Sequence, residues 1–425
     1  MTIYTALDDK INILSDRIID YARELLKRPS LSGRELEAQQ YVLEVVKNLE
    51  ADNIDFWEPD YDELKNHPAF VSDRTDFSGS PNLAATWKGA GEGRSLILCS
   101  HIDVVPEGEP AEWHHPPFGG EVCDGVIYGR GVSDMKGSMA AMFGAISAIK
   151  SLNYKLCGDL SVISTVEEET GSAGALSVAL RGYRADAAII PEPNGFALGP
   201  AQQGAVRFLV NIKGKSAHAG QRHMGVSAVE KADMVRRGIE EYEKYLNENY
   251  RSELYRHTET PFTINIGLFH SGDWFCTVPE TARLEGRMAV PPGLTVVESM
   301  TNLRAFIQKE TRGDPWLSRH PPEIEVLGTY WEPAGIPADH TIVLTAAGAY
   351  SSFTGREAAI QGTPWGTDGR MFTEFARTPA LVFGPGTSAH CPDEFLPVAD
   401  LLDYTKILAR IIVQWCGVKG EGDGK

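Results

Sequence analysis

Four apolar segments of the chain each lead into residues that can bind metal or transfer protons. The segments are residues 95–99, 160–166, 187–190 and 380–383, and stretches with a helical pattern separate them. Short apolar runs of this kind are typical of strands that are buried on both faces of a sheet. The pattern therefore predicts an α/β fold in which helices flank a mixed sheet.

The side chains that follow these four segments are histidines and carboxylates. His101 follows the first segment, Glu168 and Glu169 follow the second, Glu192 the third and His390 the fourth. In open α/β sheets, ligands collect beyond the carboxyl ends of the strands. We therefore expect these side chains to meet at one edge of the sheet.

Two more carboxylates are candidates for the same site. Asp103 lies two residues after His101, and Asp134 lies in GRGVSDMKG, before an apolar helical pattern. Taken alone, His101 is equally a buried histidine with satisfied hydrogen bonds, and Asp134 a helix N-cap. Taken as a set, the histidines His101 and His390 and the carboxylates Asp134, Glu169 and Glu192 suit two borderline divalent ions such as zinc, with one carboxylate bridging. Ions about 3.5–4 Å apart hold a hydroxide at neutral pH, and they would offset the repulsion within the triple glutamate that follows the second segment.

Between the third and fourth segments the pattern changes. A strand at 205–213 precedes a long charged helix at about 227–247, two strands, a helix at about 296–310 and a last strand at 323–328. This βαββαβ order is that of a small α+β sandwich. We expect an inserted domain at 206–331, with the catalytic domain formed by 1–205 and 332–425.

The pattern of apolar residues in the N-terminal region predicts helices. Residues 11–50 carry apolar positions at helical spacing, which indicates two helices. Ser32 and Glu35 have the spacing of a capping box at the start of the second helix.

Composition argues against several classes of binding partner and location. The 425 residues carry a net charge of −18, which argues against nucleic acid and against an anionic membrane surface as partners. No run approaches 18 apolar residues, so no membrane span is expected. The N-terminus shows no signal-peptide pattern, and the six cysteines form no CxxC pair, which favours reduced thiols in the cytoplasm.

Seven motifs, in order along the chain, resemble one family. They are HIDVVP (101–106), GRGVSDMKG (129–137), EEETGS (167–172), PEP (191–193), GKSAHAG (214–220), GTDGR (366–370) and GPGTSAHCPDEF (384–395). The sequence is similar over nearly its whole length to the dinuclear zinc amidohydrolases that include acetylornithine deacetylase, succinyl-diaminopimelate desuccinylase, aminoacylase and carboxypeptidase G.

The resemblance implies a role for each residue of the cluster. Asp134 would bridge two divalent ions, zinc in the first place, with cobalt or manganese as alternatives. His101 and Glu192 would complete one site, and Glu169 and His390 the other.

Two catalytic carboxylates are also implied. Glu168 would be the general base that takes a proton from the water bridging the two ions and later gives it to the leaving amine. Asp103 would stand behind His101 and orient its imidazole.

The inserted domain would act as a lid and as the contact of a homodimer. His218 in GKSAHAG would stabilise the oxyanion from the partner subunit, the alternative being a surface loop histidine. Arg370, Arg287 and Asn265 are candidate substrate contacts, and for each arginine a surface salt bridge is the alternative.

The resemblance implies an enzyme that cleaves an N-acyl amide of a small amine or amino acid, most similar to acetylornithine deacetylase. The stretches WKGAGEGRSLILCSHIDVVPEG and NIGLFHSGDWFCTVPE also resemble the deformylases of formylaminopyrimidines. A dipeptidase or carboxypeptidase of the same chemistry is a further alternative. A homologue that only binds ligands would lack a metal ligand or the base, and all of these positions are filled.

Overall fold

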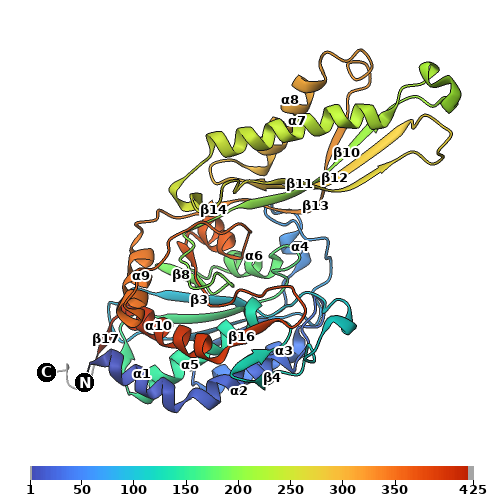
Figure 1. Ribbon diagram of the computed structural model, residues 1–425. Coiled ribbons are helices and arrows are strands. Elements are labelled where there is room, and N and C mark those ends of the chain that lie inside the picture. Colours follow the sequence, from blue (N-terminus) through green and yellow to red (C-terminus); the bar gives the residue numbers. More distant parts are fainter. Residues whose placement is uncertain (1, 420–425) are drawn as a thin grey trace. The chain divides into compact units, whose positions relative to one another are not determined.

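The computed structural model describes residues 2–419 and divides the chain into two compact units. One unit comprises Met1–Ala201, Gly335–Thr363 and Thr367–Lys425, and the other comprises Gln202–Ala334 and Pro364–Gly366. The first is called the larger unit and the second the smaller unit. Each is built around its own sheet (Figure 1).

The larger unit contains a mixed sheet, as the sequence predicted, and this sheet has six strands. Its strands, in spatial order, are β1 (Asn53–Trp57), β2 (Asn82–Trp87), β7 (Leu160–Thr165), β3 (Leu96–His101), β8 (Ala187–Ile190) and β15 (Ala380–Val382). The strands β7, β3, β8 and β15 run parallel to one another. The strand β2 pairs antiparallel with β7 on one side and with β1 on the other. The four parallel strands therefore end at the same edge.

Alternate side chains of the parallel strands enter two different apolar cores. In β3, Leu96 and Leu98 belong to one core, while Ile97 and Cys99 belong to the other. The first core is shared with the helices α2 (Ser15–Leu26), α5 (Gly137–Ser151) and α10 (Val398–Cys416), and the second with α6 (Ala173–Leu180) and the turn Met371–Phe375. Helices therefore cover both faces, which explains why these strands are continuously apolar.

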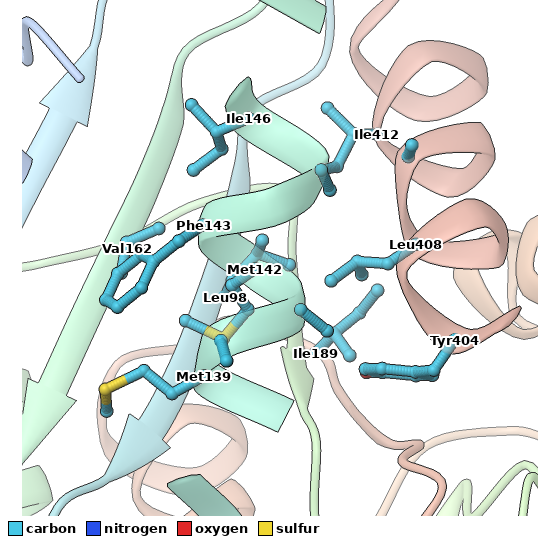
Figure 2. Close-up of a cluster of buried hydrophobic side chains, with 14 of the residues drawn as sticks. Leu98, Met139, Met142, Phe143, Ile146, Val162, Ile189, Tyr404, Leu408 and Ile412 are labelled. Atoms are coloured by element: carbon cyan, nitrogen blue, oxygen red, sulfur yellow. The ribbon is translucent and has the colours of Figure 1, made fainter. Parts of the chain in front are cut away.

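The helix α5 is apolar on all sides because it is enclosed on all sides. Figure 2 shows its side chains between strand residues Leu98, Val162 and Ile189 and the α10 residues Leu408 and Ile412. Every residue from 137 to 149 is buried. A helix with this pattern belongs to a core, and its N-terminus follows directly on the segment that carries Asp134.

The N-terminal region differs from the prediction in two respects. It forms three helices rather than two, because the first pattern is interrupted at Leu14: α1 (Ile3–Ile13), α2 and α3 (Leu36–Asn48). The capping box is also wrong. Glu35 makes no side-chain cap of α3; its buried carboxylate accepts hydrogen bonds from the Ser80 hydroxyl (2.5 Å) and the Gly33 amide (3.0 Å) instead.

The remaining elements of the larger unit are short, apart from one helix. They are α4 (Tyr61–Leu64), β4 (Glu121–Cys123), β5 (Val126–Tyr128), β6 (Lys155–Leu156), α9 (Thr341–Thr354), β16 (Phe395–Pro397) and β17 (Val418–Lys419). The two-residue strands β9 (Ala201–Gln202) and β14 (Ala334–Gly335) also pair. Within residues 2–419, no helix combines the length and the apolar character that crossing a membrane requires.

The smaller unit has the βαββαβ order that the sequence predicted. Its elements are β10 (Gly204–Lys213), α7 (Ala228–Asn249), β11 (Ile264–Ser271), β12 (Thr281–Val290), α8 (Val296–Thr311) and β13 (Glu323–Trp331). The antiparallel sheet has the order β11-β12-β10-β13. Alternate residues of β10, from Val206 to Ile212, form its core together with α7 and α8.

One short segment groups with the smaller unit although the sequence places it in the second part of the catalytic domain. Residues Pro364–Gly366 lie against the smaller unit's sheet. A Cβ at Gly366 would approach the Trp331 side chain to 2.9 Å, and an Arg287 guanidinium nitrogen lies 3.5 Å from the Pro364 carbonyl oxygen.

Replacing Phe143 with Ala tests the packing of α5. Phe143 is fully buried and meets Tyr21 edge-to-face at 5.6 Å, so its removal should lower the free energy of unfolding by about 3–5 kcal/mol. The measurement is the urea midpoint of the larger unit's unfolding transition. Leu344→Ala, at a 55% exposed position on α9, is the matched control and should change the midpoint little; equal losses in the two variants would contradict the packing described.

Candidate metal centre

The candidate ligands come together at the edge where the parallel strands end. The strand β3 ends at His101, β7 is followed by Glu168 and Glu169, and β8 is followed by Glu192. His390 lies on the loop after β15. This is the convergence that the four apolar segments predicted.

Asp134 lies at the centre of the cluster, with a histidine at each of its oxygens. Its Oδ1 is 3.1 Å from His101 Nε2, and its Oδ2 is 3.3 Å from His390 Nε2. On one side, Glu192 Oε2 lies 3.9 Å from His101 Nε2; on the other, Glu169 Oε1 lies 3.0 Å from His390 Nε2. Ligand atoms of His101, Asp134 and Glu169 all lie within 4.8 Å of one another.

The cluster concentrates negative charge in a buried place. Glu192 is 4% exposed, and among the described residues its buried Oε1 has no hydrogen-bond partner. Burial and the Asp134 charge raise the pKa of Glu192 well above its usual range. A divalent cation requires donors of this kind: an unpartnered carboxylate oxygen, two histidine nitrogens and several further carboxylates. The residues therefore fit the metal that the sequence implied.

The two imidazoles are the cationic partners that the chain itself supplies. Hydrogen bonds to Asp134 and Glu169 raise the pKa of His390 to about 10. Burial opposes the charge of His101, but its hydrogen bond to Asp134 and the nearby carboxylates raise its pKa well above the usual value. Burial by itself would raise the pKa of Asp134. The hydrogen bonds from the two histidines outweigh this effect, and the pKa of Asp134 is lowered.

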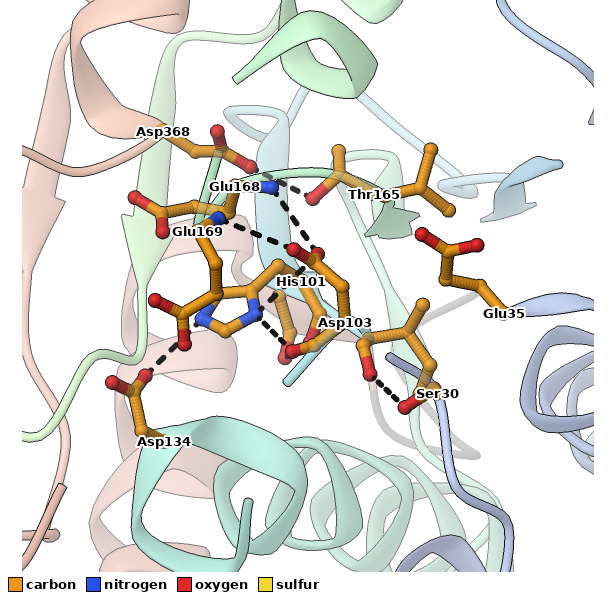
Figure 3. Close-up of polar contacts among 12 residues, drawn as sticks. Ser30, Glu35, His101, Asp103, Asp134, Thr165, Glu168, Glu169 and Asp368 are labelled. Atoms are coloured by element: carbon orange, nitrogen blue, oxygen red, sulfur yellow. Dashed lines mark hydrogen bonds and ion pairs between the residues drawn. The ribbon is translucent and has the colours of Figure 1, made fainter. Parts of the chain in front are cut away.

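Asp103 connects the ends of β3 and β7. Its backbone carbonyl accepts a hydrogen bond from His101 Nδ1 at 2.9 Å, which leaves Nε2 facing Asp134. Its carboxylate accepts the backbone amides of Glu168 and Glu169, each at 3.2 Å (Figure 3). The expected orienting contact to His101 is thus made by the carbonyl, with the carboxylate 3.7 Å from Nδ1.

The three adjacent glutamates have three different environments. Glu167 is buried and accepts a hydrogen bond from Ser72, and burial raises its pKa to about 7. Glu169 contacts His390. Glu168 is 8% exposed, and no described residue donates a hydrogen bond to its carboxylate. Burial and the neighbouring Glu192 raise the pKa of Glu168 well above its usual range. Of the three, Glu168 alone is buried beside the metal ligands with its carboxylate free.

Two buried carboxylates near the cluster were not assigned from the sequence, although both lie within its motifs. Asp368 in GTDGR accepts a hydrogen bond from the Thr165 hydroxyl (2.7 Å), and burial raises its pKa to about 6. Glu394 binds the loop that carries Asp134. Neither follows a strand directly, so the strand-end pattern gave no signal for them.

Arg370 is buried in the larger unit, 2% exposed, with a guanidinium nitrogen 3.4 Å from the Ala69 carbonyl oxygen. A surface salt bridge is therefore wrong for Arg370. Burial and the charge of Arg370 lower the pKa of His67.

The other three candidates lie in the smaller unit. His218 is exposed at the start of the short helix Ala219–Met224, and its Nδ1 accepts the Gly220 amide at 3.1 Å. Asn265 and Arg287 are directly paired between β11 and β12. Among the residues described, no carboxylate forms an ion pair with Arg287, whose pKa is lowered by burial.

Known proteins are similar to this chain over most of its length. The profile of peptidase family M20/M25/M40 matches residues 97–414. An N-formyl-4-amino-5-aminomethyl-2-methylpyrimidine deformylase of Halalkalibacterium halodurans is 30% identical over 405 residues, covering 90% of each chain. An acetylornithine deacetylase of Proteus mirabilis is 28% identical over 96% of this chain and 98% of its own.

Among solved structures, the aminopeptidase PepT of Bacillus cereus superposes with a TM-score of 0.71 at 20% identity. The match covers 94% of this chain and 98% of the aminopeptidase, and it supports the fold. With its cluster of histidines and carboxylates at the sheet edge, the chain belongs to peptidase family M20/M25/M40, a family of metal-dependent hydrolases that act on amide bonds.

Proposed function

We propose that the protein removes a short acyl group from an amine nitrogen of a small molecule, using two divalent ions held around Asp134. The observation that carries the proposal is the placement of Asp134 between two histidines with the Glu168 carboxylate buried beside them. Each Asp134 oxygen faces its own imidazole, and each imidazole lies near its own glutamate, which supports two ions with Asp134 between them. Zinc suits this mixture of donors, with cobalt or manganese as alternatives.

The residues of the chain divide the work around that centre. Bound there, the ions would supply a Lewis acid for the amide carbonyl and lower the pKa of a water molecule. Glu168 accepts a proton from the attacking water on its carboxylate and passes it to the leaving nitrogen. Asp103 keeps the Glu168 backbone in place through the hydrogen bond at 3.2 Å.

We assign the remaining candidates to binding. His218, exposed in the smaller unit, donates to the carbonyl oxygen as it gains charge, and it does so from the partner subunit of a homodimer formed through the smaller unit. Arg287, Asn265 and Arg370 hold the polar groups of the substrate. The free state of all six cysteines supports a cytoplasmic location.

The acyl group that we place first is formyl, on an aminopyrimidine-type amine. The support is the deformylase relative, which is 30% identical over 90% of this chain. An N-acetyl amino acid is the second candidate, supported by the acetylornithine deacetylase relative. Both need the same cluster and differ in the walls of the substrate pocket, where one methyl group changes binding by about 1–3 kcal/mol.

A substrate panel tests the proposal. Metal-loaded protein is incubated with N-formyl aminomethylpyrimidine, N-formyl and N-acetyl amino acids, N-succinyl amines and dipeptides, and the released amine is measured. We expect cleavage of the formyl or acetyl compounds and loss of that cleavage with a chelator. Cleavage of dipeptides alone would contradict the acyl-amine assignment, and no cleavage by protein that holds both metals would contradict the catalytic one.

Replacing Glu168 and Glu169 separately distinguishes the base from the ligand. Glu168→Gln should lower kcat by about 10²–10⁴-fold, with about two ions per chain retained in dialysed protein. Glu169→Gln should lose metal, because it removes a ligand beside His390. Metal is counted by mass spectrometry of the digested protein. The reverse pattern, with metal lost from Glu168→Gln only, would show that the roles are exchanged.

Mixing two inactive variants tests the role of His218 across subunits. Glu168→Gln and His218→Ala should each be nearly inactive. After subunit exchange at equal concentrations, roughly a quarter of wild-type activity should return, because half of the dimers are mixed and each contains one intact site. Exchange without recovery, with exchange itself verified by differently tagged subunits, would place His218 in its own subunit's site.

A further inference from the structure

Glu394 is a buried carboxylate that binds the loop carrying Asp134 from behind. It is completely buried. Its Oε1 accepts the backbone amides of Ser133 (2.8 Å) and Asp134 (3.0 Å). Its Oε2 accepts the Gly131 amide (3.0 Å) and the Arg130 guanidinium (2.7 Å). Four donors therefore converge on a single side chain.

The loop needs this partner because it has no regular structure of its own at Asp134. The dihedral angles of Asp134 (φ −126°, ψ 87°) and Met135 (φ −139°, ψ 30°) are not helical. Without a helical ladder, the amides of residues 133 and 134 have no carbonyl of the preceding turn to bind. Buried amides left without an acceptor are costly, so the Glu394 carboxylate determines where the Asp134 backbone lies.

Glu394 lies on the same loop as His390, four residues after it. The two loops are joined at other points as well: the Ser388 amide donates to the Ser133 hydroxyl (3.1 Å), and the Gly129 amide donates to the Glu394 carbonyl (2.9 Å). His390 itself has a φ of 61°, in the left-handed region that non-glycine residues adopt only when their surroundings hold them there.

We propose that Glu394 is a positioning residue that sets the separation between Asp134 and His390, and thereby the geometry of the metal centre. It acts through backbone amides and touches neither the ions nor the substrate. The inference rests on the proposed metal centre and adds a determinant of its affinity. Only a carboxylate serves here, because a glutamine would turn its own NH₂ group toward backbone N–H donors and leave Arg130 without its counter-charge.

The test is a cobalt(II) titration of metal-free full-length protein, followed by the visible absorption of the bound ion. Glu394→Gln should bind cobalt about 10–100-fold more weakly than wild type, as is typical when a residue behind a ligand is replaced. Its absorption bands should also shift, since they report the arrangement of the ligands. Phe143→Ala is the control: it destabilises the same unit from a site in the core and should leave cobalt affinity and bands unchanged.

The possible outcomes separate this inference from the proposed function. Wild-type protein that binds no cobalt would overturn the metal centre itself. Wild-type binding with equal affinity and bands in Glu394→Gln would overturn only the role of Glu394, as would an equal loss of affinity in Phe143→Ala. If Glu394→Gln does not fold, Glu394→Asp takes its place, since it keeps the charge and shortens the reach; wild-type affinity and bands there would likewise overturn the proposal.

Discussion

The concentration of carboxylates around Asp134 is the constraint to which the rest of the larger unit is adapted. Four parallel strands end at one edge and place histidines and glutamates there, where burial removes the water that would screen the carboxylates. Two imidazoles offset part of the charge. Burial, together with the neighbouring carboxylates, still raises the pKa values of Glu168 and Glu192. The fold therefore brings together side chains that only a strong local positive charge would stabilise.

The backbone around the cluster is held by carboxylates of a second kind. Asp103 binds the amides of Glu168 and Glu169, and Glu394 binds those of Ser133 and Asp134. In both cases an acidic side chain fixes the loop on which another acidic side chain is carried. This arrangement allows irregular loops to hold ligands accurately, because a buried carboxylate binds two consecutive backbone amides of each loop.

The apolar cores supply the rigidity on which this arrangement depends. The helix α5, enclosed between the sheet and α10, begins directly after the Asp134 loop, and β3 ends at His101 itself. Close packing of the kind seen around α5 stabilises the unit in which these elements carry their ligands.

The sequence by itself determined the four parallel strands of the larger unit, the convergence of the histidines and glutamates, and the βαββαβ order of the smaller unit. These follow from local patterns: apolar runs of strand length, strand ends, and the identity of the residue that comes next. It also pointed to the family through seven motifs. The capping box at Glu35 failed because a distant hydroxyl, that of Ser80, competes for the carboxylate, and no local pattern shows this. Asp368 and Glu394 were missed for the same reason, since their partners lie 203 and about 260 residues away along the chain. The resemblance singled out Glu168 among the three adjacent glutamates, but only tertiary structure decided that its carboxylate is free, because burial and hydrogen-bond partners, unlike residue type, are properties of the folded chain.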